Sequence, residues 1–385
     1  MLGRLRTSRE QRDFEAFVRA MLRSGDSSAV FERVADLDVP PPYRIRVKVV
    51  YASVSPMSVM GYLEERGFVQ RLAPQTNSYA CSSSASIRDR RARAPFFLAS
   101  FAGGNVSERV QAVVAICNSS QWKALMRFVG NAYPRLVPVL LSQSDLVHAV
   151  RRLRARSGHE VRVRDISAKV AIQTAEGKGS KSVREWTDQH LGDALAGIQE
   201  SRQLVTSLEV EFFPILGGLS HVRPKSVCKL RKNGEMEVAG SFRLAFNTVA
   251  DYVARVGDMK LQFYSKRGLR ESEYKPRPLA IRYGHPIFED VEEVRSFVRV
   301  LASYPRSMHS VVHGNPHAEV RLTDLLDGSS FDVWAVPPAK LAIVPGLKGT
   351  EAALERLVHY IFDKFREGEV VEYGGDGRAL EVLVE

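Results

Sequence analysis

The sequence predicts an α+β protein made mainly of antiparallel sheets, with helices packed on one face. Three observations favour this class. Of the 385 residues, 44% are apolar and 26% are charged, which is typical of a globular chain. Short runs of alternating apolar and polar residues recur, and turn signals such as Asn233-Gly234 separate them. From residue 279 onward the patterns follow one another as strand, helix, four strands and helix.

Two patterns are well defined in the first half. Apolar residues at helical spacing predict a helix over residues 9–22, with Ser8 as its N-cap. Residues 44–51 alternate apolar and basic side chains, which predicts a strand with one core face and one cationic face. The other expected elements are a helix over 55–66, a long hairpin or loop over 73–93, strands over 95–101 and 109–117, a helix over 121–129, a strand over 136–141, a helix over 144–156 and a strand over 161–166.

In the second half, Asn233-Gly234 predicts a type I′ hairpin turn, because both residues tolerate positive φ angles. It joins strands expected over 229–232 and 235–246. The other expected elements are a helix over 182–204, a strand over 208–213, a helix over 247–256, a strand over 260–265, a strand over 279–283, a helix over 289–304, strands over 307–313, 317–322, 331–336 and 341–345, and a helix over 350–365.

The polar, glycine-containing segment 173–182 is the expected linker between two domains. It separates a basic N-terminal domain, residues 1–172, from a neutral C-terminal domain, residues 183–385. The charged stretch 266–277 is expected to be a loop and is the candidate position for a further division of the C-terminal domain.

The order strand, helix, four strands, helix near the C-terminus is that of a curved antiparallel sheet with helices against one face. A looser version can be traced over residues 44–129, so we expect an internal structural repeat of this unit. The order resembles that of the saddle-shaped domains of TATA-binding proteins. This resemblance is one of topology and implies only the sheet architecture.

The formal charge of +11 belongs entirely to the first half of the chain. Residues 1–200 contain 30 Lys and Arg against 19 Asp and Glu, whereas residues 201–385 contain 25 of each. A basic half beside a neutral half favours a polyanionic partner. The chain has 41 Arg and 14 Lys, which suits bidentate recognition of phosphate but is equally typical of a GC-rich genome.

Basic side chains cluster in three places: the strand over 44–51, the loop around residue 90, and the helix end and strand over 151–164. If the fold brings them together, they would contact six or more phosphates. The expected nucleic-acid contacts are Arg44, Arg46, Lys48, Arg88, Arg90, Arg91, Arg93, Arg151, Arg152, Arg154, Arg156, Arg162 and Arg164. The alternatives for all of them are a merely solvated basic face and a contact with an anionic protein or membrane surface.

Other patterns carry weaker functional hypotheses. His309, His313 and His317 are spaced by four residues, but Gly-Asn-Pro interrupts them, so surface histidines of a hairpin are favoured over a metal site. Glu209 and Glu211 share one face of a predicted strand, as the paired carboxylates of nucleases do. No lysine follows at the spacing of a restriction-type nuclease core, so a catalytic role is not favoured. In the segment 345–350, a plain turn with an N-capping threonine is favoured over a phosphate loop.

We therefore expect a nucleic-acid-binding protein that contacts the phosphate backbone of DNA or RNA with little sequence specificity. A metal-dependent nuclease or phosphohydrolase, and a non-catalytic scaffold subunit, are the alternatives. No catalytic motif is found, and no cofactor or metal is expected. The neutral C-terminal half is expected to form a homo-oligomer or bind a protein partner. The cytoplasm is the expected location, because the three cysteines are scattered and no secretory signal is found. No apolar run reaches membrane-spanning length, which argues against a membrane.

Overall fold

The computed structural model describes the greater part of the chain. The described residues are 7–24, 26–52, 54–74, 76–81, 94–101, 106–156, 158–170, 182–185, 203–214, 224–266, 277–313 and 318–373. The chain divides into two compact units, here called unit 1 (Met1–Lys169 and Lys181–Gly257) and unit 2 (Val170–Ser180 and Asp258–Glu385). Each unit combines helices with an antiparallel sheet, which confirms the predicted fold class.

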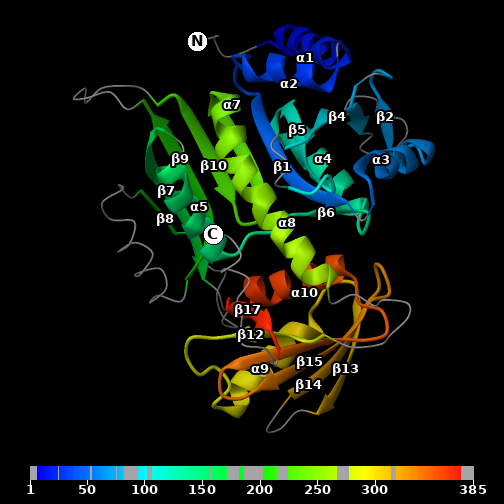
Figure 1. Cartoon of the computed structure of the whole chain (residues 1–385), viewed down its shortest axis with the longest axis vertical. Coiled ribbons are helices and arrows are strands. Elements are labelled where there is room, and N and C mark those ends of the chain that lie inside the picture. Colours follow the sequence, from blue (N-terminus) through cyan, green and yellow to red (C-terminus); the bar gives the residue numbers. More distant parts are fainter. Residues whose placement is uncertain are drawn as a thin grey trace. The chain divides into compact units, whose positions relative to one another are not determined.

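Unit 1 is built around one large sheet (Figure 1). Its strands run in the order β2-β3-β4-β5-β1-β11-β10-β9-β7-β8, and β6 also pairs with β1. The elements are α1 (Ser8–Arg23), α2 (Ser27–Ala35), β1 (Arg44–Ala52), α3 (Pro56–Glu65), β2 (Val69–Arg71), β3 (Ser78–Cys81), β4 (Ala94–Ala99), β5 (Val110–Cys117), α4 (Ser119–Asn131), β6 (Leu136–Pro138), α5 (Gln143–Arg156), β7 (Glu160–Val170), β8 (Ser182–Glu185), β9 (Gln203–Phe213), β10 (Ser226–Arg231), β11 (Glu235–Gly240) and α7 (Phe242–Ala245). A π-helical turn, Phe246–Ala250, joins α7 to α8 (Asp251–Ser265), within which unit 1 ends.

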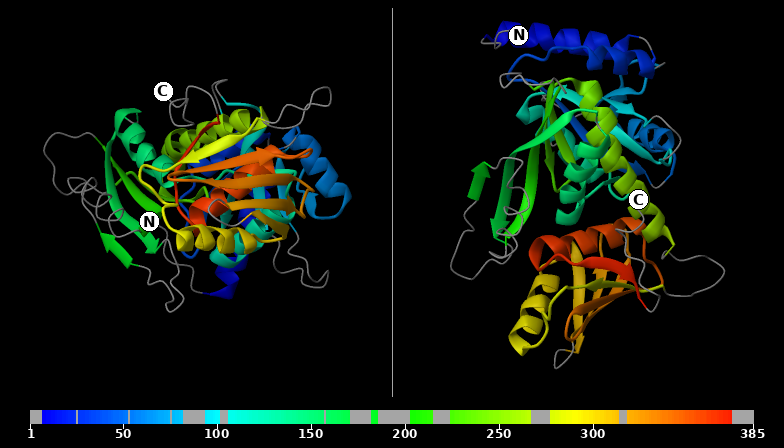
Figure 2. Two further views of the ribbon diagram at one scale, coloured as in Figure 1. Left: turned by 90° about the horizontal axis from the view of Figure 1, so that it is seen from below. Right: turned by 60° about the vertical axis from the view of Figure 1, so that its left-hand side comes forward.

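Unit 2 has a smaller sheet with strands in the order β13-β14-β15-β16-β12-β17. Its elements are β12 (Leu279–Arg282), α9 (Val291–Ala302), β13 (Ser307–His313), β14 (Ala318–Asp324), β15 (Ser330–Val336), β16 (Lys340–Pro345), α10 (Glu351–Lys364) and β17 (Glu369–Glu372). Both helices pack on one face of this sheet and share its apolar core (Figure 2). The predicted strand, helix, four strands and helix are confirmed, and β17 is an additional strand.

The expected internal repeat is present. In unit 1, β1, α3, β2, β3, β4, β5, α4 and β6 follow the same order as β12, α9, β13, β14, β15, β16, α10 and β17 in unit 2. In both, the first strand pairs antiparallel with the fifth strand and with the strand after the second helix. The second to fifth strands are neighbours in chain order in both sheets. The two segments therefore share one topology.

A third run of this order follows in the second part of unit 1. It consists of β6, α5, β7, β9, β10, β11 and the helix α7–α8, with β8 inserted after β7 as its antiparallel partner. Its later strands lie in the order β11-β10-β9-β7, but its first strand, β6, pairs with β1. Strand β1 therefore joins the two repeats of unit 1 into one sheet.

Strand β1 is buried almost along its whole length. It pairs with β5 on one side and with β11 and β6 on the other, and only Arg44 at its start is half-exposed. On one face, Val50 and Ala52 join a core formed with α3 and α4. On the other face, Val47 and Val49 are fully buried. The helices of unit 1 thus cover both faces of its sheet, whereas those of unit 2 cover one.

The expected linker at 173–182 lies almost entirely outside the described residues. Strand pairing continues across it, because β8, β9, β10 and β11 belong to the same sheet as β1. The division between the units falls after Gly257, within α8. The sheet of unit 1 therefore combines strands from the basic half and from the neutral half of the sequence.

Several local predictions were wrong. Residues 242–245, expected at the end of a strand, form helix α7. Residues 182–185 form strand β8 rather than the start of a helix, because they pair with β7. Residues 260–265 continue helix α8 instead of forming a strand, since Val256, Met259 and Phe263 also fit a helical spacing and are buried. The N-cap of helix α1 is Thr7 and not Ser8, because the Thr7 hydroxyl accepts from the Glu10 N–H at 3.2 Å in a capping box.

The hairpin at Asn233-Gly234 is confirmed, but its turn is not type I′. Lys229 is paired with Glu237 and Leu230 with Met236, so the loop contains three residues, Lys232 to Gly234. Only Gly234 has a positive φ, 74°, and its N–H donates to the Arg231 carbonyl. This geometry is that of a three-residue loop that ends in a left-handed glycine.

Among the described residues, no helix has the length and apolar character that crossing a bilayer requires.

Replacing Gly234 by alanine should destabilise unit 1 by about 2 kcal/mol or more. The added Cβ would meet both the positive φ and the backbone oxygen of Val139. Gly67 is the matched control, because its φ is 73° but nothing lies within 4 Å of its missing Cβ. Gly67→Ala should cost only about 1 kcal/mol. Denaturant unfolding measures both, and equal losses would contradict the close approach at Val139.

The three cysteines should resist thiol reagents in the native protein. Cys81, Cys117 and Cys228 are free and fully buried. Burial raises the pKa of Cys81 to about 11 and that of Cys117 to about 12, and it also raises the pKa of Cys228. Since the thiolate is the reactive form, Ellman's reagent near pH 8 should modify them only after unfolding. Rapid modification with an unchanged circular dichroism spectrum would contradict this core.

Candidate nucleic-acid interface

The structure places the basic residues of β1 inside the protein. The exposed fraction of Arg46 is 8% and that of Lys48 is 3%, so the prediction that this strand presents a cationic surface was wrong. Arg46 contacts Glu237 at 3.1 Å and Ser119 at 3.3 Å, and its guanidinium lies 5.9 Å from the centre of the Trp122 ring. The Lys48 ammonium donates to the Asn233 carbonyl. Both are buried because β5 and β11 flank β1 and α4 covers this face.

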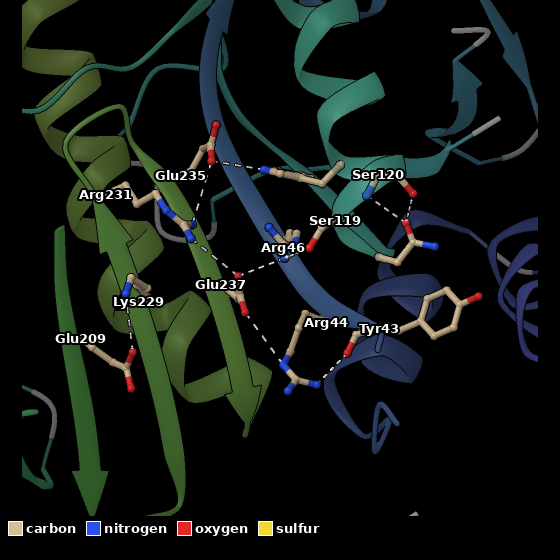
Figure 3. Close-up of polar contacts among 12 residues, drawn as sticks. Tyr43, Arg44, Arg46, Ser119, Ser120, Glu209, Lys229, Arg231, Glu235 and Glu237 are labelled. Atoms are coloured by element: carbon tan, nitrogen blue, oxygen red, sulfur yellow. Dashed lines mark hydrogen bonds and ion pairs between the residues drawn. The ribbon is translucent and has the colours of Figure 1, made fainter. Parts of the chain in front are cut away.

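These cations belong to two rows of charged side chains that cross the sheet. The strand registers place Glu209 of β9, Lys229 of β10, Glu237 of β11 and Arg46 of β1 side by side in one row. The second row consists of Arg231, Glu235 and Lys48. We call these seven residues the charge ladder. Figure 3 shows the ladder residues other than Lys48 on the sheet face that also carries α4.

Opposite charges alternate along the ladder. Lys229 lies 3.9 Å from Glu209, and the Arg231 guanidinium lies 4.0 Å from Glu235 and 3.8 Å from Glu237 (Figure 3). Trp122 donates its indole N–H to Glu235 at 3.2 Å. Four cations therefore stand beside three carboxylates, and the ladder presents little net charge to a polyanion.

Glu237 faces three guanidinium groups. Its carboxylate is 3.1 Å from Arg46, 3.8 Å from Arg231 and 3.9 Å from Arg44. About a quarter of its side chain is exposed. One carboxylate thus neutralises guanidinium groups from two neighbouring strands, β1 and β10.

The signal for this pairing is present in the sequence. Lys229 and Arg231 precede the hairpin turn, and Glu235 and Glu237 follow it at the same spacing. Antiparallel pairing across a short loop brings such residues opposite one another. The predicted hairpin therefore brings Lys229 and Arg231 close to Glu237 and Glu235. The contact of Arg46 with Glu237, in contrast, requires the long-range pairing of β1 with β11.

The second basic cluster lies where α5 and β7 meet. Arg151 and Arg154 are exposed near the end of α5, and Arg152 is half-exposed. The Nε of Arg154 donates to the Val161 carbonyl at 3.4 Å, which links the helix to the strand. The side chain of Arg156 lies outside the described residues.

Arg162 and Arg164 extend this cluster along β7. They are exposed, while Val161 and Val163 between them are buried. Arg162 contacts Glu160 at 2.7 Å and lies 4.7 Å from the centre of the Phe213 ring. Arg164, with 56% of its side chain exposed, lies 3.6 Å from Glu209 and 3.4 Å from Glu211. We call the exposed or half-exposed arginines the α5–β7 corner: Arg151, Arg152, Arg154, Arg162 and Arg164.

The third expected cluster is outside the described residues. It comprises Arg88, Arg90, Arg91 and Arg93. The two described clusters both belong to unit 1, but they do not form one cationic surface. One is buried and paired, and the other is exposed.

The structure also places most of the residues of the weaker hypotheses. Glu209 and Glu211 face Arg164 and Lys229, so they neutralise cations. Among the described residues, no group of three histidine, cysteine or acidic side chains could hold a metal ion. His309 and His313 are exposed on β13, and His317 is outside the described residues. Thr350 caps α10 by accepting from the Ala353 N–H at 3.2 Å, so the loop before it is the favoured capped turn.

No protein-family model matches the sequence, and no curated protein matches it significantly. What the chain does is therefore inferred from the burial, charges and contacts of its own residues.

Replacing Glu237 by glutamine should destabilise unit 1 by about 2–3 kcal/mol. The change removes the charge that faces three guanidinium groups and leaves the buried Arg46 without its carboxylate. The matched control is Glu160→Gln, because Glu160 forms an ion pair with about half of its side chain exposed. It should cost less than about 0.5 kcal/mol. Urea unfolding of both variants measures the difference, and equal stabilities would show that the ladder is not a stabilising network.

Proposed function

We propose that this protein binds the phosphate backbone of DNA or RNA through the α5–β7 corner, with little sequence selectivity. One observation carries the proposal: guanidinium groups of the corner are exposed on a helix and on the strand that directly follows it. The charge ladder is excluded from the contact, since Arg46 and Lys48 are buried and the side chains of Lys229 and Arg231 are exposed to only 28% and 32%. The proposed interface is therefore smaller than the sequence alone suggests.

The local structure supports a fixed arrangement of these side chains. Gly158 has a φ of 60° in the turn between α5 and β7, which lets the chain reverse direction within a few residues. The contact of Arg154 with the Val161 carbonyl joins the helix end to the strand. Side chains on a helix and a strand lose less conformational entropy on binding than side chains of a flexible tail.

The chemistry of the corner suits phosphate. A guanidinium group donates two parallel hydrogen bonds to a phosphate, and it is more weakly hydrated than an ammonium group. Arg151 has no carboxylate partner among the described residues and is therefore available for such a contact. Arg162 stacks on Phe213, which restricts its side chain while leaving it exposed.

The proposal also sets the strength of the interaction. Arg162 and Arg164 already face Glu160, Glu209 and Glu211. A phosphate must compete with these carboxylates, so binding should be moderate and sensitive to salt. Base edges are not required for this contact, which is the physical reason to expect little sequence selectivity.

The double variant Arg151→Glu, Arg162→Glu should weaken binding to a labelled oligonucleotide by at least about tenfold at low salt. It should also reduce the slope of log affinity against log salt by about two, one for each lost phosphate contact. Fluorescence anisotropy with duplex DNA and with single-stranded RNA, between roughly 50 and 200 mM salt, measures both quantities and compares the two nucleic acids.

The matched control is Arg299→Glu, since Arg299 of α9 is exposed to 74% and belongs to unit 2. Its affinity and salt slope should equal those of the unaltered protein. Binding that is absent at low salt, or equally lost in the control, would reject the α5–β7 corner as the contact.

A further inference from the structure

Strand β13 forms one edge of the unit 2 sheet and differs from an ordinary edge strand. Within the described residues it pairs only with β14. All of its residues after Ser307 are exposed. Its outer edge therefore presents backbone N–H and C=O groups that have no strand partner in the described part of the chain. Such groups can pair with another extended chain.

The composition of β13 does not protect this edge. Its sequence, Ser-Met-His-Ser-Val-Val-His, contains no Lys, Arg, Asp, Glu, Pro or Gly. Met308 is exposed to 64%, Val311 to 46% and Val312 to 52%. Native edge strands are usually short, charged or interrupted by proline, because these features prevent pairing with other chains.

The other edges of the described sheets follow that rule. Strand β17, on the opposite edge of unit 2, has four residues and carries a glutamate at each end. In unit 1, β2 has three residues and includes Arg71, and β8 has four and includes Arg184 and Glu185. Strand β13 is longer than each of these and uncharged. The lack of protection is thus specific to this edge.

We infer that β13 is a self-association site, at which the edge pairs antiparallel with the same strand of a second copy of this chain. The charge pattern favours a second copy over an unrelated peptide. Because the strand is uncharged, it offers nothing that would select a charged partner, and it matches an equally uncharged edge without repulsion.

The register of β13 is compatible with two-fold symmetry. Met308 and Ser310 share the open face of the sheet with Thr323 and Arg321, and Val311 lies on the face of Val320. A two-fold axis perpendicular to the sheet makes two copies of the strand antiparallel. It also brings the Met308 side chains of both copies onto one face and the Val311 side chains onto the other.

The size of the contact determines its strength. The register is irregular between Val311 and His313, so regular pairing is limited to the first part of the strand. An edge of this length buries less than the roughly 1,200–2,000 Å² of a stable interface. We therefore expect reversible association with a dissociation constant in the micromolar range or weaker, on the order of 10 μM.

Sedimentation velocity of the full chain from about 1 to about 200 μM, without nucleic acid, tests this inference. The unaltered protein should shift from monomer to dimer across the series. Met308→Lys places a charge of the same sign in both copies and should weaken association by at least about tenfold. Leu347→Lys is the matched control, because Leu347 is exposed to 75% outside the strands of the same unit, and it should associate like the unaltered protein.

Three results would overturn the inference. They are a protein that stays monomeric over the whole series, a Met308→Lys variant that dimerises normally, and a Leu347→Lys variant that is weakened equally. Since the experiment contains no nucleic acid, its outcome is independent of binding at the α5–β7 corner.

Discussion

The burial of charge on β1 is the constraint on which the rest of unit 1 depends. This strand joins two repeats into one sheet, so both of its faces and both of its edges are covered. It nevertheless carries Arg46 and Lys48 at buried positions. A buried cation requires a partner that replaces its water, and the β10–β11 hairpin supplies Glu237 to Arg46 and the Asn233 carbonyl to Lys48. The pairing of β1 with β11 is thus an electrostatic requirement as well as a backbone one.

This constraint also separates the arginines of unit 1 by role. Those near the centre of the sheet, Arg46 and Arg231, are buried or mostly covered and contact Glu237 of β11. Those at the end of α5 and on β7 lie close to the edge of the sheet and remain exposed. Net charge alone cannot distinguish the two groups. The surface that is available to a polyanion is therefore much smaller than the formal excess of positive charge suggests.

Much of the fold could be predicted because it depends on local patterns. The unit 2 helices and strands follow from hydrophobic spacing and turn residues, and the repeat follows from their order. The burial of Lys48 could not be predicted, since the alternation over residues 44–51 is equally typical of a strand with a solvated face. Long-range pairing decides between the two. The clustering of the α5–β7 arginines could be predicted because they are close in sequence, whereas the pairing of Arg46 with Glu237 joins strands that are far apart in sequence.

A double-mutant cycle on Arg46 and Glu237 tests the central claim most directly. Arg46→Met and Glu237→Gln are made separately and together, and the free energy of unfolding is measured for each protein. If the pairing of these side chains holds β1 to β11, the double variant should lose less than the sum of the single losses, with a coupling energy of about 1–3 kcal/mol. Additive losses would contradict the account, because they would show that each side chain stabilises the protein independently of the other.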